Sequence, residues 1–232
     1  MSIATLRRLV LLWGITISLV STSITMPALA GQKNSDRASF PGRRIGGGTR
    51  GECLMSSQPL VALNPVNNLG ITASDRPTVY FAVPKLGGSY PVEFVLQDTD
   101  GNVVYETALA AGKTKEIVGI RLPQNSLKVG QDYHWSFAVV CEPEDRSQNL
   151  VLSGWLRRVS SQMASSNESS LQARLEQVQS AQKAGVWSDA IATLVELRQA
   201  YPDNDKVLRQ WAQLLQELEL NAVFEPSMIG QL

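Results

Sequence analysis

Large apolar and smaller or polar residues alternate with a period of two between residues 133 and 141. One side of this stretch carries its large groups, Tyr133, Trp135, Phe137, Val139 and Cys141. The other side carries His134, Ser136, Ala138 and Val140. Large side chains on one face only are typical of a half-buried β-strand. We therefore predict that residues 133–141 form the central strand of a small β-sheet structure.

Other stretches between residues 59 and 159 are rich in β-branched and aromatic residues, as strands are. Asp100-Gly101 separates two of them and predicts a hairpin, and Asn67-Asn68-Leu69-Gly70 predicts a turn. The expected further strands are 59–63, 78–83, 92–97, 103–107, 117–122 and 150–159. About seven short strands in about a hundred residues favour an Ig-like antiparallel β-sandwich over residues 53–160.

The residues before the central strand match a tyrosine corner, in which a tyrosine hydroxyl bonds to backbone upstream. Leu127, Gly130 and Tyr133 have the required spacing. We expect the Tyr133 hydroxyl to bond to the backbone that precedes it.

Residues 161–170 are polar, and we interpret them as a linker. After this linker, apolar residues recur at the three- and four-residue steps of a helix. Residues 171–220 predict three helices, followed by a tail at 221–232. The spacing of the second helix and its end matches half of a tetratricopeptide repeat, through Gly185, Trp187, Ala190, Leu194, Leu197 and Pro202. Stacked repeats usually need about three units to bury a core. This tetratricopeptide-like segment should therefore pack on the sandwich or on another chain.

Residues 1–30 have the layout of a secretory signal peptide. Arg7 and Arg8 precede an apolar run at 9–20, and Ala28-Leu29-Ala30 resembles a cleavage site. The run is short for a membrane span, which takes about 20 residues. We expect a periplasmic or secreted protein without a membrane span after signal removal; a retained anchor is the alternative.

Cys53 and Cys141 are the only cysteines. In an oxidising compartment an even pair favours a disulfide. Its loop of about 90 residues would stabilise the fold by about 4–5 kcal/mol in the chain-entropy account. A metal site built from two isolated cysteines and one distant histidine lacks the usual ligand spacing.

Residues 31–52 are rich in Gly, Ser and basic residues and predict a flexible basic arm. Arg43, Arg44 and Arg50 form a possible site for an anionic partner; an arm that binds nothing is the alternative. Gly46, Gly48 and Gly51 formally match a dinucleotide fingerprint, but neither the strand nor the helix that it needs flanks them. We therefore expect no cofactor. The zero net charge of the whole chain argues against a nucleic-acid partner.

Glu142, Glu144 and Asp145 cluster immediately after Cys141. Several carboxylates could hold a calcium ion, although their spacing matches no calcium loop. A turn network that includes Arg146 is the alternative. His134 is the only histidine, and the sequence places no nucleophile beside it.

Five segments together resemble a cyanobacterial family, domain-of-unknown-function family 928. They are Arg43-Arg44-Ile45-Gly46-Gly47-Gly48-Thr49-Arg50-Gly51-Glu52-Cys53, Asp75-Arg76-Pro77-Thr78, Cys141-Glu142-Pro143-Glu144-Asp145-Arg146-Ser147, Gly154-Trp155-Leu156-Arg157-Arg158 and Gly185-Val186-Trp187-Ser188-Asp189-Ala190. The resemblance implies an exported cyanobacterial protein and no particular reaction.

These patterns favour an exported, non-enzymatic binding or scaffold module of the cell envelope. Sandwich edges and helical grooves serve protein partners more often than catalysis. The expected partner is a protein or another envelope component, and the sequence does not determine the oligomeric state. The alternative is an envelope carbohydrate-binding protein or a hydrolase that uses Asp and Glu residues elsewhere in the chain.

Overall fold

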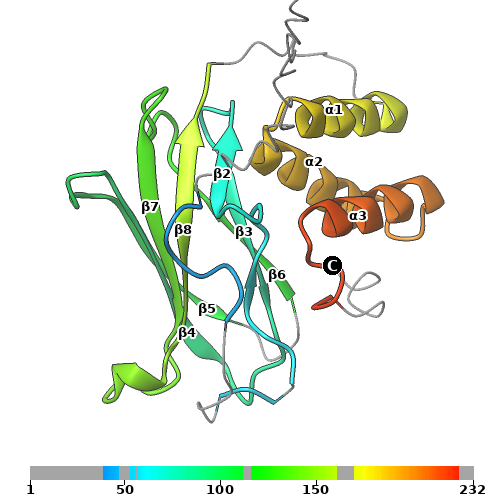
Figure 1. The fold of residues 1–232 in the computed structure, drawn as a ribbon. Coiled ribbons are helices and arrows are strands. Elements are labelled where there is room, and N and C mark those ends of the chain that lie inside the picture. Colours follow the sequence, from blue (N-terminus) through cyan, green and yellow to red (C-terminus); the bar gives the residue numbers. More distant parts are fainter. Residues whose placement is uncertain (1–38, 47–52, 56, 112–115, 161–169, 225–232) are drawn as a thin grey trace, which may run out of the picture. The chain divides into compact units, whose positions relative to one another are not determined.

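The computed structural model describes residues 39–46, 53–55, 57–111, 116–160 and 170–224 (Figure 1). In chain order the elements are β1 (Val61–Ala62), β2 (Leu69–Thr72), β3 (Thr78–Val83), β4 (Tyr90–Gln97), β5 (Val103–Ala111), β6 (Glu116–Arg121), β7 (Asp132–Val139), the 3-10 helix η1 (Arg146–Gln148), β8 (Leu150–Arg158), α1 (Leu171–Lys183), α2 (Trp187–Ala200) and α3 (Asp205–Glu217). The signal segment and the linker at 161–169 lie outside the described residues.

Strand β7 lies in the middle of a five-stranded sheet whose order is β2-β8-β7-β4-β5. Burial alternates along it, with Tyr133, Trp135, Phe137 and Val139 buried. The prediction of a central, half-buried strand is confirmed, although the strand ends at Val139. The β4–β5 hairpin is confirmed too, and the Asp98 carboxylate accepts hydrogen bonds from the N–H groups of Asp100 and Asn102 inside its turn.

The prediction of an entirely antiparallel structure is wrong at β2. This strand pairs in parallel with β8, with Leu69 opposite Trp155 and Thr72 opposite Arg158. The predicted turn is shorter than expected: it ends at Asn68, whose φ is 61°. Leu69 and Gly70, which were assigned to the turn, instead begin the strand.

A second sheet has three strands in the order β1-β3-β6 and packs against the first. Phe81 of β3 stacks on Phe137 of β7, with ring centroids 3.9 Å apart. The Trp135 indole lies over Gly154 of β8, where no side chain would fit. We call this layer the inter-sheet core.

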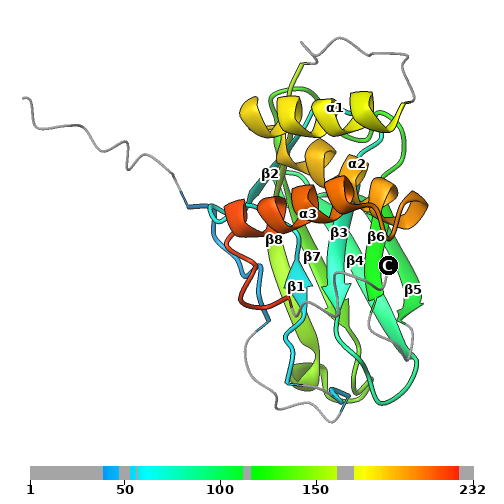
Figure 2. The same cartoon turned by 90° about the vertical axis from the view of Figure 1, so that its right-hand side faces the viewer.

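Three C-terminal helices are present, as predicted. Together with the outer face of the three-stranded sheet they form a second apolar cluster, which we call the helix–sheet core (Figure 2). Tyr80 and Ala82 of β3 meet Leu194 and Trp211 of the helices there. The helical segment therefore packs on the β-structure of its own chain, one of the two arrangements expected from its short length.

Residues 39–46 differ from the flexible arm that we predicted. The backbone of Arg43 exchanges two hydrogen bonds with Ser153 of β8, and the N–H of Gly46 donates to the Leu60 carbonyl. The Trp155 indole N–H donates to the Pro41 carbonyl at 2.9 Å. These bonds hold the segment along the sheet. The tail also begins later than predicted, because Phe224 is buried against Trp211.

Candidate functional site

Cys53 and Cys141 form a disulfide with their Cα atoms 5.5 Å apart, the pairing expected from the sequence. The Cys53 carbonyl accepts a hydrogen bond from Gly87, in the β3–β4 connection. The disulfide therefore joins the segment before β1 to the end of β7, at the edge of the inter-sheet core.

The acidic residues that follow Cys141 make local contacts in the loop after β7. Asp145 caps η1 and accepts hydrogen bonds from the backbone and hydroxyl of Ser147, while Glu142 and Glu144 are exposed. Among the described residues, no group of three or more His, Cys, Asp or Glu could hold a metal ion. Asp145 therefore serves as a helix cap, and the Glu142 carboxylate accepts a hydrogen bond from the Glu144 N–H at 3.4 Å.

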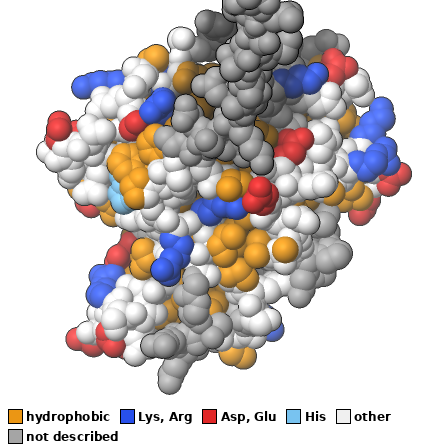
Figure 3. Space-filling view, viewed as in Figure 1, with side chains coloured by type: hydrophobic (Ala, Val, Ile, Leu, Met, Phe, Trp, Pro, Cys, Tyr) orange, Lys and Arg blue, Asp and Glu red, His pale blue; other side chains and the backbone are white. Residues whose placement is uncertain are grey.

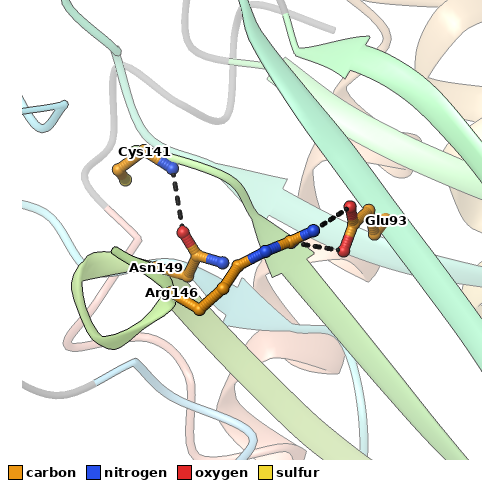
Figure 4. A network of polar contacts seen from close by, with 4 residues as sticks. All are labelled: Glu93, Cys141, Arg146 and Asn149. Atoms are coloured by element: carbon orange, nitrogen blue, oxygen red, sulfur yellow. Dashed lines mark hydrogen bonds and ion pairs between the residues drawn. The ribbon is translucent and has the colours of Figure 1, made fainter. Parts of the chain in front are cut away.

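Arg146, which we expected to join a local turn network, reaches a neighbouring strand instead. It makes two hydrogen bonds with the Glu93 carboxylate of β4, at 2.8 and 3.1 Å (Figure 4). Asn149 accepts a hydrogen bond from the Cys141 N–H at 3.2 Å in the same view. These contacts hold the loop after β7 against the sheet.

The segment before β7 has the contacts of a tyrosine corner. The Lys128 N–H donates to the Tyr133 hydroxyl at 2.9 Å. Gly130 has φ +80°, a conformation that a glycine adopts without strain. Leu127 is buried beneath the turn. These contacts support a structural role for the three residues.

Of the three arginines that we proposed as one anionic-partner site, two are described, and their side chains lie in different environments. Arg43 is exposed, but the Arg44 guanidinium donates to the Leu218 carbonyl at 2.8 Å and the Asn64 carbonyl at 3.3 Å. Burial lowers the pKa of Arg44. Arg50 lies outside the described residues. On the face seen in Figure 3, basic side chains are interspersed with acidic ones. Arg44 thus serves mainly to tie the first strand to the end of the helical segment.

A carboxylate that the sequence did not single out as a contact joins the helices to the sheet. Asp189, in the first turn of α2, accepts a hydrogen bond from the Thr72 hydroxyl at 2.5 Å and another from the Ala73 N–H at 2.9 Å. Burial raises the pKa of Asp189 above its ordinary value. We call these contacts the Asp189 clasp.

The outer faces of α1 and α3 form a polar groove lined by side-chain amides. Gln179 donates to Gln210, Gln210 to Gln182, and Gln182 to Glu217, at 2.9–3.1 Å. Gln213 donates to Glu217 from the other side at 2.9 Å. Two adjoining hollows of about 400 and 410 Å³ lie over this network, and we call them together the amide groove.

The amide groove also carries cationic groups. Lys183, Lys206 and Arg209 line it, and the Lys206 ammonium donates to Gln172 at 3.2 Å. Sequence reasoning missed the groove because exposed glutamines resemble an ordinary solvated helix face. The spacing of Gln172, Gln179 and Gln182 by seven and three residues was the available signal, since it places them on one side of α1.

A family model described as Domain of Unknown Function (DUF928) matches residues 45–228, most of the chain. The chain belongs to the DUF928 family. A search of curated proteins found no match. In this DUF928 protein the matched span contains both cysteines, the tyrosine corner, the Asp189 clasp and the amide groove, whereas Arg43 and Arg44 precede it. In the part of the chain that is described, no helix is both long and apolar enough to cross a membrane.

Proposed function

We propose that this protein is an exported, non-enzymatic binding or scaffold module of a cyanobacterial cell envelope, and that the amide groove binds an extended segment of a partner protein. In this proposal the two sheets act as an Ig-like support. The three helices act as one and a half tetratricopeptide-like repeats that present the groove.

The amide groove is the observation that carries this proposal. Each glutamine amide has two N–H donors and two acceptor sites, and the network described above uses only part of this capacity. A row of amides with remaining donors and acceptors matches the alternating C=O and N–H groups of an extended peptide. Lys183, Lys206 and Arg209 would favour acidic side chains in that peptide.

Two observations support export. The first thirty residues have the order of charge, apolar run and small residues that signal peptides have. The single cysteine pair forms a disulfide, which persists in oxidising compartments and is rare in the cytosol. Together the two observations support the periplasmic or secreted location that we propose.

The hydrolase alternative finds less support in the carboxylates of the described residues. Asp189 and Glu196 line a common cleft, but both are engaged: Asp189 by Thr72 and Ala73, and Glu196 by Arg174 at 2.6 Å. Seven residues also separate them on α2, which is about 10 Å along the helix axis. A general acid needs a proton that it can deliver to the substrate, and neither group is free to do so.

Photo-cross-linking in the source organism tests the proposed groove. The full chain would carry a photoreactive phenylalanine derivative in place of Gln213, and in a matched variant in place of Gln216, which is exposed on α3 outside the groove. We expect one defined cross-linked protein from position 213 and none from 216. Equal labelling from both positions, or none from 213, would contradict the proposal.

Point variants then measure what the groove contributes to the affinity for the cross-linked partner. Gln179→Ala/Gln213→Ala should weaken binding at least about tenfold, because two hydrogen-bonding side chains are lost. Gln199→Ala/Gln216→Ala makes the same chemical change at exposed positions outside the groove and should leave binding unchanged. Deleting residues 171–232 would be a poorer test, since it would expose the apolar outer face of β3.

Mass spectrometry of the native protein from fractionated cells tests export separately. We expect a mature N-terminus near residue 31, an intact Cys53–Cys141 bond and recovery in the periplasmic or secreted fraction. Recovery from the cytoplasm with Met1 retained and both thiols free would refute this part of the proposal.

A further inference from the structure

A second concave site lies between the end of the β3–β6 ladder and the helices α1 and α2. This cleft has a volume of about 390 Å³, within the range of pockets that hold small ligands. Its wall on the sheet side comes from the β2–β3 connection and the end of β6, and its other wall comes from α1 and α2. We call it the junction cleft.

Two arginines line the sheet side of the junction cleft. Arg121 ends β6 and pairs with Thr78 across the ladder. Arg76 is brought to the same end because the Leu122 N–H donates to the carbonyl of the adjoining Pro77 at 2.9 Å. Both arginines are exposed, and neither guanidinium has a hydrogen bond or ion pair with any of the described residues.

The acidic groups of the junction cleft do not neutralise these arginines. Asp189 is held in its clasp with Thr72 and Ala73. Glu196 forms an ion pair with Arg174 at 2.6 Å. Among the described residues, the charged groups of the cleft that have no hydrogen-bond or ion-pair partner are therefore the two guanidinium groups. A guanidinium group fits an oxyanion well.

The rest of the lining supplies neutral hydrogen-bonding groups. The hydroxyls of Ser74, Thr78 and Thr193 and the Gln177 amide face the same cleft. Hydroxyls and amides both donate and accept, so they match a ligand that carries several hydroxyl groups.

We propose that the junction cleft binds one unit of an acidic sugar, with its carboxylate or phosphate on Arg76 and Arg121 and its hydroxyls on the neutral groups. The site is separate from the amide groove and does not depend on the function proposed for it. An envelope protein with both sites would hold a protein partner on α1–α3 and an acidic glycan at the junction.

Chemical-shift titration of the ¹⁵N-labelled full chain with its disulfide formed tests the proposal. The probes are glucuronate, glucose 6-phosphate, glucose and inorganic phosphate. We expect the two acidic sugars to shift the amides of Thr78, Arg121 and Thr193 saturably, with a dissociation constant on the order of 1 mM. Glucose should bind at least about tenfold more weakly. The acidic sugar that binds more tightly shows whether the site prefers a carboxylate or a phosphate.

Charge variants link the binding to the cleft. Arg76→Gln and Arg121→Gln should each weaken the binding of the acidic sugars at least about tenfold, through the loss of a charged hydrogen bond. Arg121→Lys should retain part of it. Lys85→Gln changes the net charge equally at an exposed position elsewhere and should have no effect. Far-UV circular dichroism verifies that each variant is folded.

Four outcomes would overturn the proposal. Glucose could bind as well as glucuronate, inorganic phosphate could bind as tightly as both acidic sugars, Lys85→Gln could weaken binding as much as Arg121→Gln, or neither acidic sugar could cause saturable shifts. None of these results bears on cross-linking at Gln213, so the two proposals can fail independently.

Discussion

The two cores of this protein are built from different kinds of contact. The inter-sheet core has a group of aromatic rings in contact among its aliphatic side chains: Phe81 stacks on Phe137 and lies edge-on to Trp135, with ring centroids 5.3 Å apart. The helix–sheet core is mainly aliphatic, and polar groups cross its borders at the Asp189 clasp and at the Arg44 contacts with Leu218.

This difference suits the two parts to different roles: the sheets support the molecule, and the helices present the amide groove. A dry, closely packed core tolerates few changes, because any lost volume leaves a cavity. Borders that are made of directed hydrogen bonds fix orientation with little apolar area. The helices, which carry the amide groove, are therefore held on the sheet by the apolar helix–sheet core and by directed polar contacts at its borders.

The largest effect is expected from breaking the inter-sheet core. Phe137→Ala removes a fully buried ring and should lower the free energy of unfolding by about 3–5 kcal/mol. Urea unfolding followed by circular dichroism measures it. A loss below about 2 kcal/mol would mean that the neighbouring rings collapse into the space. The inter-sheet core would then not be the more rigid of the two cores.

The disulfide at the edge of the same core should have the next largest effect. Cys53→Ala/Cys141→Ala removes a link between residues 88 positions apart, which frees the unfolded chain. We expect a loss of about 2–4 kcal/mol, measured as a lower melting temperature. Reductant should lower the melting temperature of the unmodified protein towards that of the double variant and leave the variant itself unchanged.

The Asp189 clasp tests the polar border of the helix–sheet core. Asp189→Ala removes both acceptors, leaves the Thr72 hydroxyl and the Ala73 N–H without their partner, and should cost about 1–3 kcal/mol at neutral pH. Amide hydrogen exchange should increase in α2 and change little in β7. Equal increases in both elements would show that the two cores are one cooperative unit.

Asp189 should also make the free energy of unfolding depend on pH. Because the folded-state pKa of Asp189 is raised, the folded protein holds this proton to a higher pH than the unfolded chain does. The resulting stabilisation is present below the ordinary aspartate pKa of about 3.9 and is lost as pH rises through the raised value. Urea unfolding between pH 3.5 and 7 should show this decline, and Asp189→Asn should lack it.

The smallest effect is expected at the tyrosine corner. Tyr133→Phe removes the acceptor of the Lys128 N–H and the long hydrogen bond that the hydroxyl donates to Gln131 at 3.4 Å, and it should cost about 0.5–1.5 kcal/mol. Chemical denaturation is sensitive enough to measure this change. An unaltered midpoint would assign the corner to packing of the ring rather than to its hydroxyl.

Local patterns predicted those parts of the fold that depend on neighbouring residues. Alternation located β7 and its buried face, Asp100-Gly101 located the β4–β5 turn, and the change of period located the three helices. The four residues of β2 gave no such signal, because the strand is short and its partner lies 86 residues away at Trp155.

The candidate site was less predictable because its residues have no local signature. Glutamines on α1 and α3 become a groove only when the two helices lie side by side. Arg44 resembled part of a loose arm, since the carbonyl of Leu218 that it contacts lies 174 positions away. Arg76 and Arg121 likewise meet only through the β3–β6 ladder.

The parallel pairing of β2 with β8 also determines when the protein can finish folding. Leu69 has no partner until Trp155 has been synthesised, so the edge of the sheet next to β8 stays open during most of translation. Hairpins such as β4–β5 can form early, but closing this long-range pair carries the entropic cost of the intervening chain. The slowest step of assembly should therefore be the docking of β2, the first strand of the five-stranded sheet to be synthesised, against β8, the last.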